Sequence, residues 1–150
     1  MLSRALVVLS SLAVAAAAAR QHPAAATVPH YPAAGPCTTG TPTVTGGYTI
    51  TYAQAKPSIA FEQGYKPEPA WAKDHAVGSY TFGVPQPHET GFAYAQFKCQ
   101  NYCNNNGHGG FFVSYAGPGS DCTCFDELLD PRSFVDNNQS LVGAWNPICK

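Results

Sequence analysis

The six cysteines of this 150-residue chain restrict its fold more than any other feature of the sequence. An even number of cysteines in an exported chain favours disulfide bonds over free thiols or metal-binding thiolates, because the export route is oxidising. Six cysteines allow fifteen formal pairings into three bonds. The spacing of the cysteines must therefore narrow the choice, and they stand at Cys37, Cys99, Cys103, Cys122, Cys124 and Cys149.

The N-terminal residues predict export. Arg4 supplies a positive charge, residues 5–16 form an apolar stretch, and the alanines at 17–19 form a small-residue cleavage site. The apolar run of about 15 residues is shorter than the roughly 20 of a bilayer-spanning helix. We therefore interpret residues 1–19 as a signal peptide and expect a secreted, extracellular product without a membrane partner. About 131 residues remain, enough for one domain.

Four of the cysteines form two pairs with matching geometry. Cys99 and Cys103 are four residues apart on a predicted helix, so they share one helix face. Cys122 and Cys124 are two apart on a predicted strand and also share a face. The two helix cysteines can thus face the two strand cysteines. Which helix cysteine bonds which strand cysteine within this quartet stays open. A tetrahedral zinc site on the same four residues is the alternative, which secretion disfavours.

The two remaining cysteines set the limits of the domain. Cys37 and Cys149 pair by default and would tie the two ends of the mature fold together. Residues 20–36 are rich in alanine and proline and have little to bury, which predicts a disordered tail. We expect the folded domain at 37–150.

Residue patterns within that domain predict several strands and one main helix. Residues 43–53 read as a strand with a Gly-Gly turn, in which Tyr48, Ile50 and Tyr52 share a face. Three prolines make 55–75 an irregular connection with at most one short helical turn. Helical spacing predicts a helix from Thr90, as the cap, to Asn105. The other strands are predicted at 78–84, 111–115, 121–129 and 141–145, the last in a stretch that is otherwise mostly loop. The predicted fold class is α+β, a small antiparallel sheet with one main helix attached by disulfides.

Charge and composition exclude several classes of protein. The chain has 8 basic and 9 acidic residues and no basic run, so nucleic acid is not expected as a partner. Charged residues make up 11% and hydrophobic residues 45%, which is too apolar for a disordered chain and too lightly charged for a coiled coil.

No catalytic motif stands out, and we expect no enzyme. A GxSxG nucleophile turn is absent, and Gly119-Ser120 is expected in a plain Gly-Pro turn. The alternative is a small hydrolase that uses Asp126, Glu127 or Asp130, because paired carboxylates can cleave glycosides. Exposed acids are common, however, and the simpler interpretation is a solvated strand end.

The five histidines show no metal-binding spacing, and we expect no cofactor and no metal. One case is conditional on the cleavage site. If cleavage follows Ala19, Arg20-Gln21-His22 becomes a terminus with an amine, two amides and an imidazole, a donor set for square-planar Cu(II).

Two aromatic residues and one asparagine are the candidate surface sites. Trp71 and Tyr65 lie in the proline-rich connection, where an exposed ring could stack on a sugar or a partner protein. The alternative is that both rings fill the core, because a domain this small needs its large rings inside. Asn138 begins the sequence Asn-Gln-Ser, an N-glycosylation signal typical of an extracellular surface.

Three segments resemble known extracellular modules. Residues 97–103 (FKCQNYC), 110–115 (GFFVSY) and 121–125 (DCTCF) resemble PAN/apple-like modules and are similar to the WSC domain. The whole mature chain resembles small secreted cysteine-rich proteins of filamentous fungi. The resemblance implies a cysteine-bearing helix on a small antiparallel sheet, and binding rather than catalysis. We thus expect a monomeric, non-catalytic module that binds cell-wall carbohydrate or a surface or host protein, with a structural or protective protein as a further alternative.

Overall fold

The computed structural model describes residues 35–84, 88–104, 109–116, 119–139 and 141–150. The chain divides into two units, Met1–Pro32 and Ala33–Lys150. The predicted signal peptide, nearly all of the predicted tail and the conditional copper site at 20–22 lie outside the described residues.

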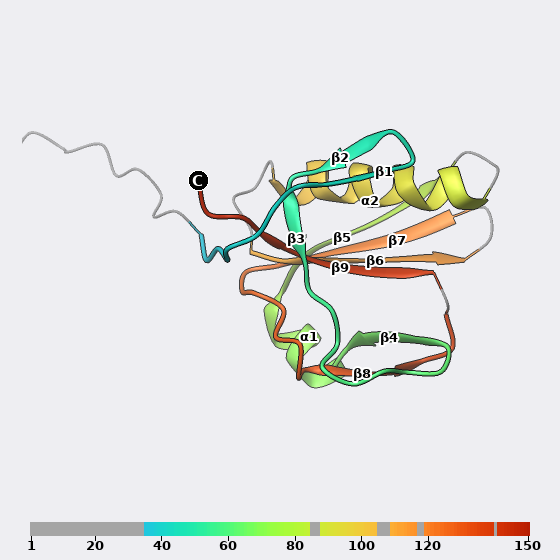
Figure 1. Cartoon of the computed structure of the whole chain (residues 1–150). Helices are drawn as coiled ribbons and strands as arrows, with labels where there is room; N and C mark the ends of the chain where they lie inside the picture. The colour runs from blue at the N-terminus through green and yellow to red at the C-terminus, as the bar shows by residue number, and fades with distance from the viewer. Residues whose placement is uncertain (1–34, 85–87, 105–108, 117–118, 140) are drawn as a thin grey trace, which may run out of the picture. The chain divides into compact units, whose positions relative to one another are not determined.

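A five-stranded antiparallel sheet is the centre of the second unit (Figure 1). Its strand order is β3-β9-β6-β7-β5, so β3 and β5 form opposite edges of the sheet although the chain passes through both before the long helix. The strands are β3 (Tyr52–Gln54), β5 (Ala76–Gly83), β6 (Phe111–Ala116), β7 (Gly119–Phe125) and β9 (Val142–Pro147). β6 and β7 are consecutive and pair from Phe111↔Cys124 to Ala116↔Gly119.

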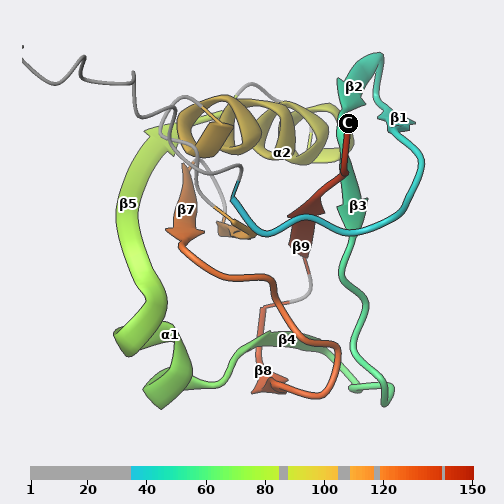
Figure 2. The same cartoon turned by 90° about the vertical axis from the view of Figure 1, so that its left-hand side faces the viewer.

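Helix α2 (His88–Asn104) covers one face of this sheet (Figure 2). Two disulfides join it to β7, Cys99–Cys122 and Cys103–Cys124. All four cysteines are fully buried, in a core cluster with Ile50, Tyr52, Phe82, Ala95, Phe111, Val113 and Trp145. The quartet therefore pairs two cysteines against two, and the structure selects the parallel choice in which the first helix cysteine bonds the first strand cysteine.

The third disulfide joins Cys37 to Cys149, the terminal bond expected from the sequence. Both cysteines are exposed. Next to the bond, Thr38 and Ile148 form an isolated parallel bridge, and the Cys149 amide donates to the Thr38 carbonyl oxygen over 3.0 Å. The two ends of the described unit are therefore held together both covalently and by backbone hydrogen bonds.

The opposite face of the sheet carries a second, smaller layer (Figures 1 and 2). It consists of the paired strands β4 (Gly64–Pro67) and β8 (Phe134–Asn137) and the short helix α1 (Pro69–His75). Its core cluster is separate from that of α2 and contains Ala55, Phe112, Phe125, Leu129, Phe134 and Ala144. Because neighbouring residues of a strand point to opposite faces, Phe111 and Phe112 serve different clusters, as do Cys124 and Phe125.

A small hairpin lies beside α2 (Figure 2). Strands β1 (Thr43–Thr45) and β2 (Tyr48–Ile50) pair antiparallel across the predicted Gly-Gly turn. Gly46 and Gly47 have φ of 54° and 82°, a region that glycine adopts without strain. The predicted shared face is confirmed, because Tyr48 is half-buried and Ile50 and Tyr52 are buried.

The connection at 55–75 is more regular than its prolines predicted. Instead of one short turn at most, it contains β4 and the seven-residue helix α1. Pro69 stands at the start of α1, where its missing N–H costs nothing, and the Glu68 carboxylate accepts a 2.8 Å hydrogen bond from the Trp71 amide. Pro67 ends β4 opposite Phe134. The prolines therefore mark element boundaries and do not prevent the elements.

Three other boundaries also differ from the prediction. Strand β8 was missed in a stretch assigned mostly to loop, because only its pairing with β4 makes it a strand. Helix α2 begins at His88, which places Thr90 inside the helix and not at its cap. Strand β7 begins at Gly119 and ends at Phe125, so Ser120 lies in a strand and is buried. The strands predicted at 78–84, 111–115 and 141–145 are confirmed as β5, β6 and β9.

The coarse fold class is confirmed, since the unit is sheet-rich and mostly antiparallel, with two helices and three disulfides. Multiple disulfides are typical of extracellular proteins. Among the described residues, no helix combines the length and the apolar character needed to cross a bilayer.

Removing one inner disulfide should destabilise the protein at least as much as removing the terminal one. The cysteines of the inner bond Cys99–Cys122 are 23 residues apart and those of the terminal bond are 112 residues apart. Loop-closure entropy alone therefore predicts the reverse, a stabilisation of about 3 kcal/mol from the inner bond against about 4.7 kcal/mol from the terminal bond. The inner sulfurs are fully buried, however, so their loss also leaves a cavity in the core. Urea unfolding of Cys99→Ala/Cys122→Ala and of Cys37→Ala/Cys149→Ala compares the two, and a clearly milder effect of the inner pair would contradict this account.

Candidate functional site

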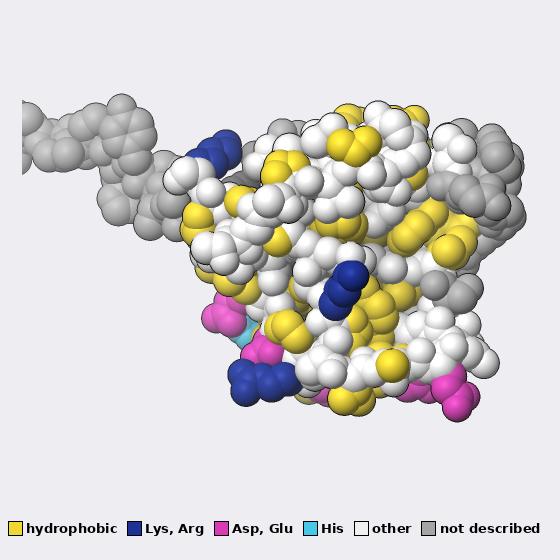
Figure 3. Space-filling model, viewed as in Figure 1, with side chains coloured by type: hydrophobic (Ala, Val, Ile, Leu, Met, Phe, Trp, Pro, Cys, Tyr) yellow, Lys and Arg dark blue, Asp and Glu magenta, His cyan; other side chains and the backbone are white. Residues whose placement is uncertain are grey.

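The two rings predicted as binding residues line two different hollows. Tyr65 lines a groove of about 470 Å³, here called the tyrosine groove. It lies between the connection after β3, strand β4 and the start of β9, and on the side shown in Figure 3 apolar side chains gather between β9 and β4. Its lining residues are Gln54, Lys56, Pro57, Ser58, Ile59, Ala60, Phe61, Gln63, Gly64, Tyr65 and Val142.

Backbone hydrogen bonds fix the connection that forms one wall of the groove. The Ala55 amide donates to the Ala144 carbonyl oxygen and the Ser58 amide to the Pro131 carbonyl oxygen, each over 2.8 Å. At the other end, a Cβ on Gly64 would overlap the backbone oxygen of Gln139, so only glycine lets β4 approach this closely. The wall is therefore anchored at both ends on the sheet and on the β8 segment.

Tyr65 belongs to both the groove and the core. Its ring is half-buried and meets Phe112 and Phe134 edge to face, with ring centroids 6.3 and 5.0 Å away. Burial raises the pKa of its hydroxyl above the ordinary 10.0, and a hydrogen bond with the Ala144 backbone opposes the shift. Tyr65 thus presents a fixed, neutral ring to the groove.

The polar side chains of the groove come from its rim. Gln54, Lys56 and Gln63 are exposed, and Lys56 is the one charged residue among the lining residues of the tyrosine groove. Two amides offer both donors and acceptors, and the ammonium offers donors only. Phe61 and Tyr65 are half-buried and add apolar ring surface to the lining. The groove thus combines apolar surface with a few polar groups, the usual construction of a small-ligand site.

The second hollow, of about 490 Å³, lies beside Trp71 and contains two of the candidate catalytic acids. The Trp71 ring is engaged in packing, because it stacks on His75 at 4.8 Å and contacts Phe125 at 4.9 Å between ring centroids. The hollow is lined by Thr38, Trp71, Glu127, Leu128, Leu129, Asp130, Pro131, Ser133 and Asn146.

The three candidate acids have partners on the surface. The Asp126 carboxylate lies 3.0 Å from His75 Nδ1, and a Glu127 oxygen lies 3.9 Å from the same nitrogen. Asp130 accepts hydrogen bonds from the side chain and the backbone of Arg132, and these hold its pKa down at about 2. An acid with that pKa is ionised at neutral pH and cannot donate a proton in glycoside cleavage.

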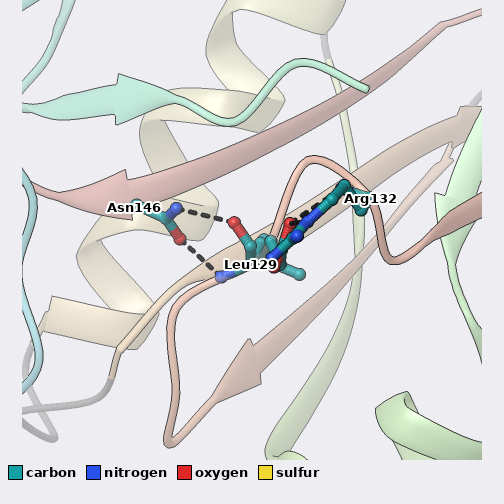
Figure 4. Close-up of polar contacts among 4 residues, drawn as sticks. Leu129, Arg132 and Asn146 are labelled. Atoms are coloured by element: carbon teal, nitrogen blue, oxygen red, sulfur yellow. Dashed lines mark hydrogen bonds and ion pairs between the residues drawn. The ribbon is translucent and has the colours of Figure 1, made fainter. Parts of the chain in front are cut away.

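An amide clamp that the sequence did not reveal holds the segment carrying these acids (Figure 4). Asn146 of β9 accepts a 2.8 Å hydrogen bond from the Leu129 amide and donates a 2.9 Å bond to the Leu129 carbonyl oxygen. A Cβ on Gly110 would lie 2.7 Å from the Asn146 side-chain oxygen, so the clamp also needs this glycine. The one sequence signal was a polar residue between Trp145 and Pro147 in an otherwise apolar strand.

The structure places the other candidate residues apart from both hollows. Asn138 is exposed just after β8, and Ser140 of its glycosylation signal lies outside the described residues. Cys99, Cys103 and Cys122 form a sulfur cluster, but in this structure the three residues are disulfide-bonded and are not thiolate ligands.

The chain matches no protein-family model, and no curated protein or solved structure matches it.

Replacing Asn146 by alanine should cost about 2–4 kcal/mol of unfolding free energy, because it leaves two buried backbone groups of Leu129 without partners at about 1–3 kcal/mol each. Asn101→Ala is the matched control. Asn101 also bonds a backbone oxygen, that of Phe97, but it is exposed, so we expect less than about 0.5 kcal/mol. Chemical denaturation measures both, and a loss for Asn146→Ala no larger than that of the control would contradict the stabilising role given to the clamp.

Arg132→Ala should raise the pKa of Asp130 from about 2 towards the ordinary 3.8. The lowered pKa means that the contact stabilises the fold at pH values above 3.8 and loses this effect as the pH falls towards 2. The stability difference between wild type and variant should therefore shrink over that range. Carboxyl-carbon NMR titration of Asp130 measures the pKa, and an unchanged midpoint in the variant would refute the role given to Arg132.

Proposed function

We propose that this chain is a secreted, non-catalytic module that binds cell-wall carbohydrate in the tyrosine groove. The observation that carries the proposal is the lining of the groove, an apolar floor with Phe61 and Tyr65 and a rim with Gln54, Gln63 and Lys56. Sugars present apolar ring faces and a belt of hydroxyl groups, and such a lining offers both stacking surface and hydrogen-bonding groups.

The shape of the groove favours a sugar over a protein partner. Its volume of about 470 Å³ falls within the range of small-ligand pockets. The large exposed hydrophobic side chains among the described residues are Val44, Ile59 and Val77, and they lie on three different segments. A protein interface would instead favour one continuous apolar patch. A surface or host protein is therefore the second choice of partner.

Three further features support a binding module outside the cell. The disulfides suit an oxidising compartment, and residues 1–19 have the pattern of an export signal. The resemblance to PAN/apple-like modules and the WSC domain fits binding, and α2 bonded to β7 corresponds to the helix expected of them. Asp130, whose carboxyl stays ionised, does not suit proton transfer, so the hydrolase alternative depends on Asp126 and Glu127.

Binding should depend on the rim of the groove. The variant Lys56→Ala/Gln63→Ala should lower by at least about 10-fold the affinity for a wall oligosaccharide that the wild type binds. The reason is that it removes two hydrogen-bonding side chains worth about 1 kcal/mol each. Both residues are exposed, so the fold should be unaffected. Titration calorimetry with fungal and plant wall oligosaccharides measures the loss.

The matched control is Lys66→Ala, which removes an exposed lysine of β4 that does not line the groove. It should leave the affinity unchanged. An equal loss in the control, or no oligosaccharide bound at millimolar concentration, overturns the assignment. Sugar release by the wild type that disappears in Asp126→Ala/Glu127→Ala would instead favour the hydrolase.

A further inference from the structure

The charge of the tyrosine groove comes from a single side chain. Lys56 is the one charged residue among its lining residues, and the others are neutral. Two acidic residues of the same layer, Glu62 before β4 and Asp136 opposite Tyr65 on β8, are exposed and do not line the groove. On the side shown in Figure 3, a basic side chain stands beside the apolar area and acidic side chains lie at the lower edge. The lining therefore offers a ligand one positive charge and no negative charge.

The ammonium of Lys56 is free to take an ionic partner. Within the described parts of the chain, no ion pair, hydrogen bond or ring contact involves this side chain. By contrast, Arg132 is bonded to Asp130 at 2.8 Å. Lys98 Nζ lies 4.8 Å from the centre of the Phe82 ring. A ligand carboxylate can therefore approach Lys56 without displacing an existing contact.

The backbone around Lys56 is held in place on both sides. The Ala55 and Ser58 amides, which flank it, donate the two 2.8 Å hydrogen bonds that anchor this wall of the groove. Pro57 follows directly and restricts the Lys56 backbone to extended conformations. The Cα of Lys56 therefore keeps a fixed place in the wall, and its ammonium stays within side-chain reach of the groove.

We propose that the groove takes a uronic-acid residue of an acidic polysaccharide, with the sugar carboxylate paired to Lys56. This inference rests on the proposed function, because it names the class of carbohydrate that the same groove binds. A uronic acid has the apolar ring face and the hydroxyl groups of a neutral sugar, and adds one carboxylate. Phe61 and Tyr65 offer ring surface to the sugar face, and the amides of Gln54 and Gln63 bond its hydroxyls. The ammonium–carboxylate contact is a charge-assisted hydrogen bond, which is stronger than a neutral one.

The number of charges favours a carboxylated sugar over a densely sulfated chain. Heavily sulfated polysaccharides bind patches of clustered Lys and Arg. This chain has 8 basic and 9 acidic residues, a net charge of −1, and the groove lining contains one cation. The protein as a whole thus exerts no net attraction on a polyanion, and one lysine matches the single carboxylate of one uronic-acid unit.

Titration calorimetry of the disulfide-bonded chain with trigalacturonate and with its methyl ester tests the pairing. Esterification removes the carboxylate charge and leaves the sugar ring in place. We expect the acid to bind about five-fold more tightly than the ester at low salt, the effect of one exposed ion pair. The preference should shrink at about 0.5 M salt, because ions screen exposed charges. A glucuronate trisaccharide and its ester, titrated in the same way, show which of the two uronic acids has the larger preference.

Two single variants assign the preference to one lysine. Lys56→Gln keeps a hydrogen-bonding side chain but removes the charge, and should abolish the preference for the acid. Lys66→Gln is the matched control, because Lys66 is an exposed lysine of β4 that does not line the groove, and should keep the preference.

The possible failures separate this inference from the proposed function. Equal binding of acid and ester by the wild type, a preference that survives in Lys56→Gln, or a preference lost in Lys66→Gln overturns the uronic-acid assignment. Binding of the ester or of a neutral wall oligosaccharide in those cases leaves carbohydrate binding in the groove intact. Absence of binding for every oligosaccharide overturns the proposed function, and this inference with it.

Discussion

The two disulfides between α2 and β7 are the constraint on which the rest of this structure depends. They fix the helix to β7, the strand next to the β5 edge of the sheet, at two successive helix turns and two alternate strand positions. The helix can therefore neither slide nor rotate on the sheet without breaking a bond. The bonds also fill the core, since their four sulfurs are fully buried. In a domain of this size, covalent links of this kind compensate for the limited apolar area that the chain can bury.

Fixing one face of the sheet leaves the other face for a second layer. Strand alternation sends Phe112 and Phe125 to that face, where α1, β4 and β8 cover them. Both hollows described above belong to this second layer, and the connection after β3 and the segment after β7 form their walls. The helix-bearing face thus supplies rigidity, and the opposite face supplies the concave surface on which the proposed binding function rests.

The aromatic residues of the second layer have two uses at once. Tyr65 packs on Phe112 and Phe134 and also lines the tyrosine groove, whereas Trp71 is enclosed by His75 and Phe125 and only borders its hollow. Asp126 forms a hydrogen bond with His75, and Asp130 forms an ion pair with Arg132. Polar groups near the Trp71 hollow therefore hold the segment 126–132 in place, whereas the exposed polar side chains that line the tyrosine groove carry the proposed binding function.

The sequence by itself determined the elements that depend on local patterns. Cysteine spacing predicted the terminal bond and the two-against-two quartet, and residue alternation predicted β5, β6 and β9.

The tertiary structure decided what depends on distant partners. Strand β8 exists because β4 lies beside it, and the order within the quartet follows from how α2 lies on β7. Gln54 and Tyr65 line the same groove only because the connection between them folds back. The Asn146 clamp on Leu129 joins residues 17 positions apart, which no local pattern reports. The physical reason is the same in each case, since propensity and periodicity act over a few residues, whereas a groove, a clamp or a disulfide order depends on the register between segments far apart in the chain.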